Sequence, residues 1–136
     1  MEKLINLFQA GTVVKEFKTK NLSFKMKTLT ADELLDVLRH SDLQSTSPET
    51  KIFTAKKWTL AYALESVNGI EIMAIPEIAQ LRASNKEKEF TKEELLLKIL
   101  GSFDAELIED LYQCYDRMVV ENNKKREELK KDLVAQ

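Results

Sequence analysis

The chain has 136 residues, of which 43% are hydrophobic and 32% are charged, and its formal net charge is −2. This length fits one domain whose core needs no metal or disulfide support, and the composition excludes a disordered or membrane-embedded chain. The one cysteine excludes an internal disulfide and suits a reducing cytoplasm.

The opening segment carries no mark of an exported chain. "MEKLINLFQAG" lacks the long apolar run and the small-residue cleavage site of a signal peptide. No stretch approaches the roughly 18 apolar residues of a membrane span. We therefore expect a cytoplasmic protein without membrane contact.

Positive charge is concentrated near the start of the chain. Residues 1–27 carry six lysines against two glutamates, a net charge of +4, which leaves −6 for the remainder. A basic segment on an acidic body can attract an acidic partner or a nucleic acid. The alternative, which we favour, is that the lysines form the solvent face of a two-stranded ribbon and protect its edges.

The first expected elements are a short helix and a β-hairpin. Residues 4–8 fit one or two turns of amphipathic helix, and residues 12–18 are rich in β-branched and aromatic side chains. "NLSFKMKTL" then alternates, which places Phe24 and Met26 on one side and the intervening lysines on the other. A turn at residues 19–21 would join the two strands.

A capping box follows the hairpin and predicts the start of a helix. The Thr30 hydroxyl can accept from the amide of Glu33, whose carboxylate can reach back to the amide of Thr30. We expect this helix to run to about Arg39 and to bury three leucines, Leu34, Leu35 and Leu38. A polar loop that begins at His40 should come next.

The next helix is predicted to start at Ser47 and to stop at an Asn-Gly pair. Ser47, Pro48 and an acidic residue in the first turn form a strong helix start. We expect the helix to include "TLAYALESV" and to end at Gly69, in the left-handed conformation that glycine adopts readily. Residues 70–72 would lie extended, or pair with the edge of the hairpin.

Three further helices complete the prediction. One runs from Pro76 to about Ala83, and a second capping box, Thr91 with Glu94, begins a short helix that is apolar nearly all round. The last and longest helix begins after Gly101, capped by Ser102 or Asp104. Beyond Val120 its apolar stripe fades into a charged extension.

These patterns predict a mainly α (α+β) fold of four to five helices, with a small N-terminal β-hairpin and a long projecting C-terminal helix. We expect one domain over residues 1–136. It divides into the N-terminal helix and hairpin (1–29), a helical body (30–120) and the charged helical extension (121–136).

The sequence contains no residue pattern that indicates catalysis or metal binding. His40 is the one histidine and is predicted to be a solvent-exposed loop residue, while Cys114 is predicted to be a partly buried thiol without a base beside it. One His and one Cys argue against a zinc site, and the three glycines stand apart rather than in a phosphate loop. We expect no enzyme activity, no cofactor, no metal and no bound nucleic acid.

Three segments resemble the small assembly chaperones of tailed bacteriophages. They are "FKMKTLTADELLDVL" (24–38), "TLAYALESVNGIEI" (59–72) and "LLLKILGSFDAELIEDLYQCYDRM" (95–118), and together they cover somewhat under half of the chain. The resemblance implies a helical protein of the host cytoplasm that binds a structural protein of the tail or baseplate, with self-association possible. Some baseplate proteins that remain in the virion share these features, so a structural subunit is the alternative. A phage-encoded regulator that binds a host protein or nucleic acid is a third.

The apolar stripe of the last helix is the predicted partner-binding site. Tyrosine offers a large apolar area with a polar tip, and methionine adapts to irregular surfaces. The alternative is that the stripe belongs to the core. The predicted site comprises Leu111, Tyr112, Tyr115, Met118 and Val119.

Overall fold

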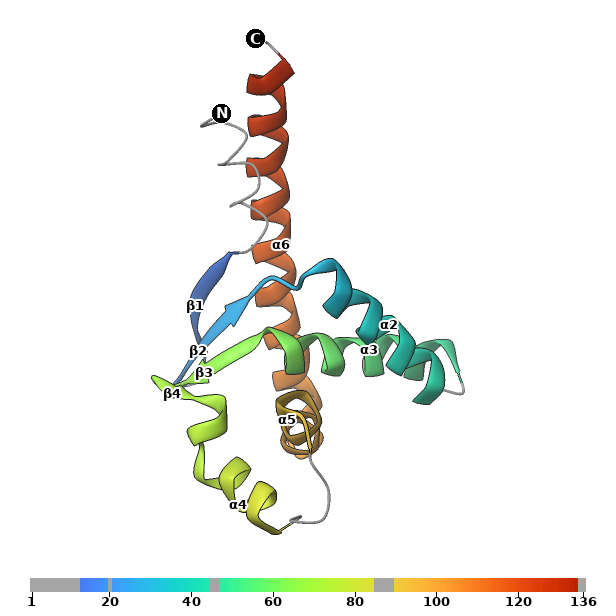
Figure 1. Cartoon of the computed structure of the whole chain (residues 1–136), viewed down its shortest axis with the longest axis vertical. Coiled ribbons are helices and arrows are strands. Elements are labelled where there is room, and N and C mark those ends of the chain that lie inside the picture. The colour runs from blue at the N-terminus through green and yellow to red at the C-terminus, as the bar shows by residue number, and fades with distance from the viewer. Residues whose placement is uncertain (1–12, 20, 45–46, 85–89, 135–136) are drawn as a thin grey trace.

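A computed structural model describes residues 13–19, 21–44, 47–84 and 90–134, and its elements lie in the order shown in Figure 1. The mainly α fold with an N-terminal hairpin and a long final helix is confirmed. The helix predicted at residues 4–8 lies outside the described residues. The elements are β1 (Val14–Thr19), β2 (Leu22–Lys27), α2 (Ala31–Gln44), α3 (Pro48–Ala63), β3 (Leu64–Val67), β4 (Ile70–Glu71), the 3₁₀ helix η1 (Ile72–Ala74), α4 (Pro76–Ser84), α5 (Lys92–Leu100) and α6 (Ala105–Val134).

The strands form one antiparallel sheet in the order β1-β2-β3-β4. β1 and β2 are joined by a tight turn in which Asn21 has a φ of 67°. The alternation in β2 is confirmed, because Phe24 and Met26 are buried while Lys25 is exposed. The aromatic ring of Phe24 therefore lies in the core rather than beside the lysines, which removes it from any nucleic-acid stacking surface.

The predicted end of the helix that begins at Ser47 is wrong. α3 ends at Ala63, and the next four residues form β3, which pairs with β2. Asn68 and Gly69 have φ values of 51° and 79° and turn the chain from β3 into β4. Two successive positive φ values are those of a type I′ hairpin turn. Gly69 is thus left-handed as predicted, but in a β-turn, and β4 pairs with β3 rather than with the N-terminal hairpin.

The helix starts are confirmed by their hydrogen bonds. The Glu33 amide donates to the Thr30 hydroxyl at 3.2 Å, and the Thr30 amide donates to the Glu33 carboxylate at 2.9 Å. Thr91 and Glu94 form the same box at α5, and Ser47 caps α3. Asp104 accepts from the Glu106 amide at the start of α6, as expected of an N-cap.

One apolar core joins the sheet to η1 and helices α3 to α6. α3 packs against α5 and α6, whereas α2 packs mainly against α3. The last turns of α6 extend beyond the other described elements (Figure 1). The buried cluster comprises Phe24, Met26, Leu60, Ala61, Ala63, Leu64, Ile72, Ile78, Leu95, Leu96, Leu100, Ile108, Leu111 and Met118.

Candidate partner-binding surface

Helix α2 presents its leucines to solvent. Leu34, Leu35 and Leu38 are 49%, 57% and 50% exposed, so the prediction that they are buried is wrong. Their spacing of one, three and four residues makes them neighbours on the helix surface. We call these three residues the leucine face.

An adjacent strip of α2 makes the contacts with the protein. Val37 and Ser41 are buried, 1% and 2% exposed, where α2 packs against α3. At 3.6 residues per turn the leucine face spans about 100° of the helix circumference beside this buried strip. An apolar arc of that width ordinarily faces a core. In this fold the neighbouring Val37 is buried, whereas the leucine face is exposed to solvent.

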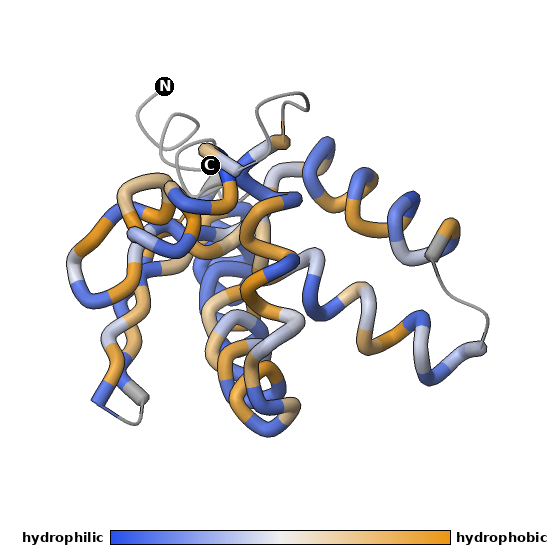
Figure 2. The backbone as a smooth tube through the Cα atoms, turned by 90° about the horizontal axis from the view of Figure 1, so that it is seen from below, coloured by the Kyte–Doolittle hydropathy of each residue, from blue (hydrophilic) through white to orange (hydrophobic). Residues whose placement is uncertain are grey.

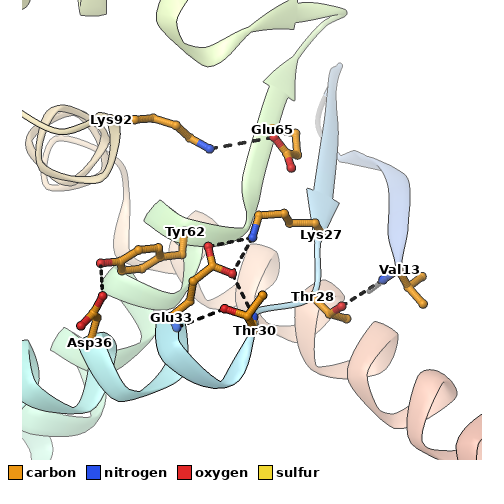
Figure 3. A network of polar contacts seen from close by, with 9 residues as sticks. All are labelled: Val13, Lys27, Thr28, Thr30, Glu33, Asp36, Tyr62, Glu65 and Lys92. Atoms are coloured by element: carbon orange, nitrogen blue, oxygen red, sulfur yellow. Dashed lines mark hydrogen bonds and ion pairs between the residues drawn. The ribbon is translucent and has the colours of Figure 1, made fainter. Parts of the chain in front are cut away.

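Polar contacts fix the first turn of α2 on the sheet, as Figure 3 shows. Lys27 of β2 donates to both carboxylate oxygens of Glu33 at 2.7 and 2.8 Å. Partial burial alone would raise the pKa of Glu33, but hydrogen bonds from Lys27 and the Thr30 amide, with the charge of Lys27, hold that pKa below its ordinary value. The ionised pair and the capping box therefore set the rotation of α2 that turns its leucines outward.

Two further contacts hold the middle of α2 on α3. The Tyr62 hydroxyl lies 3.4 Å from the Asp36 carboxylate, and the ring of His40 stacks on that of Trp58 with centroids 3.8 Å apart and planes 5° from parallel. His40 was predicted to be an exposed loop residue, and that prediction is wrong. α2 continues to Gln44 instead of ending near Arg39, because residues beyond Arg39 still find partners on α3. Figure 2 shows α2 and α3 together extending to one side of the molecule.

The burial of Tyr62, together with its contact with Asp36, makes the stability depend on pH. Burial, followed by the negative charge of Asp36, raises the pKa of Tyr62 from 10.0 to about 12. The unfolded chain releases this proton at lower pH than the folded chain, so the Tyr62 contribution to stability is lost as the pH rises from about 10 to about 12. Tyr62→Phe should therefore flatten the fall in unfolding free energy across this window, measured by urea unfolding. The slope that remains is expected from Tyr115, whose pKa burial also raises. Equal slopes for both proteins would show that the pKa of Tyr62 is not raised in the folded protein.

The predicted site on the final helix divides between core and surface. Leu111 and Met118 are 0% and 1% exposed, so neither offers its side chain to a partner in this structure. Tyr112, Tyr115 and Val119 are half-buried. The ammonium of Lys56 lies 5.3 Å from the centroid of the Tyr112 ring. Tyr115 packs against the core cluster. In this structure the apolar stripe serves chiefly to pack α6 against the rest of the fold.

Cys114 is a half-buried free thiol. No group of three or more His, Cys, Asp and Glu side chains that could hold a metal lies within the described ranges. An apolar pocket of about 420 Å³ opens between α4 and α5, with Glu77, Lys98 and Ser102 among its lining residues. The Ser102 hydroxyl donates to the Ile99 carbonyl at 2.7 Å, which is a helix-end contact rather than the base contact of an activated nucleophile.

Comparisons with known proteins identify no relative. The chain matches no protein-family model, no curated protein and no solved structure. None of the described helices is both long enough and apolar enough to cross a membrane.

Proposed function

We propose that this protein is a non-enzymatic interaction factor that binds a client protein through the leucine face of α2. The observation that carries the proposal is the exposure of Leu34, Leu35 and Leu38 on a helix whose other side is anchored by an ion pair, a capping box and a ring stack. Contiguous apolar surface on a soluble protein marks an interaction site. Because α2 is held in place, the face is already formed before a partner arrives, which lowers the entropic cost of binding.

We propose further that the client is a structural protein of a bacteriophage tail or baseplate, and that this protein is its assembly chaperone in the host cytoplasm. The support is the resemblance of residues 24–38, 59–72 and 95–118 to such chaperones. The first of these segments contains the leucine face. The alternative is a tail or baseplate subunit that remains in the virion, and a regulator of a host protein or nucleic acid is the weaker third candidate.

A charged residue on the leucine face tests the proposal. Leu35→Glu should weaken client binding at least about tenfold, because it puts a carboxylate into an apolar contact, yet change folding stability by no more than about 0.5 kcal/mol. Leu43→Glu is the matched control, since Leu43 lies on the same helix but off the leucine face and is 78% exposed. Both variants are to be compared with the parent by quantitative co-purification from infected cells and by thermal unfolding.

The outcomes separate the candidates. If Leu35→Glu and Leu43→Glu retain the same partners as the parent protein, the leucine face is not the site. Mass spectrometry of purified virions is a separate test. It distinguishes the chaperone, which should be absent, from the structural subunit, which should be present. A partner that is a nucleic acid would be recognised by binding that weakens steeply with added salt.

A further inference from the structure

Within the described part of the chain, strand β1 lies at one edge of the sheet. It pairs with β2 on one side, and in the described part of the chain no strand pairs with its other side. The Thr28 amide donates to the Val13 carbonyl at 2.9 Å, so Val13 and every second residue after it direct their backbone groups toward β2. The backbone amides and carbonyls of Val14, Glu16 and Lys18 consequently point away from the sheet.

The side chains along this edge are accessible. Val14, Lys15, Glu16 and Lys18 are all exposed. Lys15, which shares the core face of the strand with Phe17, has its ammonium 2.7 Å from the Glu121 carboxylate of α6. Figure 1 likewise shows β1 at the outer margin of the sheet.

The outer face of β1 carries opposite charges at Glu16 and Lys18, two residues whose backbone groups point away from the sheet. Glu16 and Lys18 are two residues apart, so their side chains share this face. The Ser23 hydroxyl of β2 donates to the Glu16 carboxylate, which keeps that carboxylate on the outer face. Lys18 makes no ion pair with another described residue.

We infer that β1 pairs antiparallel with β1 of a second copy of this chain, about a twofold axis at Phe17. In this register Glu16 of each copy lies directly opposite Lys18 of the other, and the two Phe17 residues face each other. Opposite charges and aromatic rings placed directly across an antiparallel pair stabilise it. The contact is isologous and closed, because each copy contributes the same surface.

Neighbouring registers are excluded by charge. A shift that centres the pair on Glu16 places the two glutamates opposite each other, and a shift that centres it on Lys18 does the same for the lysines. Like charges directly opposite destabilise strand pairing. The register about Phe17 also makes hydrogen-bonded pairs of Glu16 with Lys18, so four main-chain bonds form and the two sheets become one of eight strands. The lysines that protect this edge against arbitrary strands therefore also select its partner.

Charge reversal tests this pairing. The parent protein should sediment as a species of twice the chain mass of 15.7 kDa. Glu16→Lys and Lys18→Glu should each raise the dimer dissociation constant about tenfold or more, because each replaces both attractive pairs with repulsive ones. The double variant Glu16→Lys/Lys18→Glu should recover the parent dissociation constant. An equimolar mixture of the two single variants should form a heterodimer, since lysines at both positions then meet glutamates at both positions.

The control for net charge is Lys124→Glu, which makes the same charge change as Lys18→Glu on an exposed residue of α6 and should leave dimerisation unchanged. Circular dichroism of each variant checks that the fold is retained. A parent protein that stays monomeric would overturn the inference. Dimerisation that withstands both single reversals, or a mixture of them that stays monomeric, would equally overturn it. None of these outcomes bears on client binding by α2, which has its own variants.

Discussion

Leu111→Ala should destabilise the protein by about 3 kcal/mol, within the range measured when buried leucines are truncated. Leu111 is 0% exposed, and its side chain belongs to the core cluster in the first half of α6. Removal of three carbon atoms there loses the free energy of burying them and leaves a cavity that close-packed neighbours fill only in part. Urea unfolding, with the slope of the transition checked for two-state behaviour, measures the effect.

Leu35→Ala provides the matched comparison. It is the same chemical change on another helix, at a leucine that is 57% exposed. We expect it to alter the unfolding free energy by no more than about 0.5 kcal/mol. If Leu111→Ala changes the unfolding free energy as little as Leu35→Ala does, then the apolar stripe of α6 is not core. The stripe would then again be the candidate partner-binding site.

The two helices show why a partner-binding face is hard to predict from one sequence. Both α2 and α6 carry apolar residues at helical spacing. That spacing indicates only that one side of each helix is apolar, and not whether this side contacts the core or a partner. α6 meets the core with that side, whereas α2 reaches the protein through Val37, Ser41 and its polar anchors. The difference depends on Lys27, a residue of another element, which binds Glu33 and sets the rotation of α2. No local pattern contains that information.

Local signals predicted the elements whose hydrogen bonds are local. Each capping box joins residues three apart in the chain, so Thr30 and Thr91 could be assigned from their neighbours alone. The β1–β2 hairpin was predicted for a related reason, since alternation is a property of a single strand. The continuation of α2 beyond Arg39 was missed, because it depends on the stack of His40 on Trp58, a contact between two helices.

The switch from α3 to β3 was missed although a signal was present. An Asn-Gly pair between alternating residues is a strong hairpin signal, and "ESVNGIEI" has that form. Gly69 was interpreted instead as a helix end, which also favours a left-handed glycine. What separates the two interpretations is Asn68, whose own positive φ belongs to a type I′ turn. β2 then supplies the neighbouring strand that lets residues after Ala63 leave the helix.

Gly69→Val should cost about 1–2 kcal/mol of folding stability, because a β-branched side chain strains a backbone held at a φ of 79°. A Cβ atom at this position would meet no other atom within 4 Å, so the cost comes from the backbone conformation and not from a clash. Gly69→Asn is the control, since asparagine tolerates the left-handed region and should cost clearly less. Thermal and urea unfolding of the three proteins measure the difference. If valine and asparagine are equally harmless, then the turn between β3 and β4 is not held in the type I′ conformation.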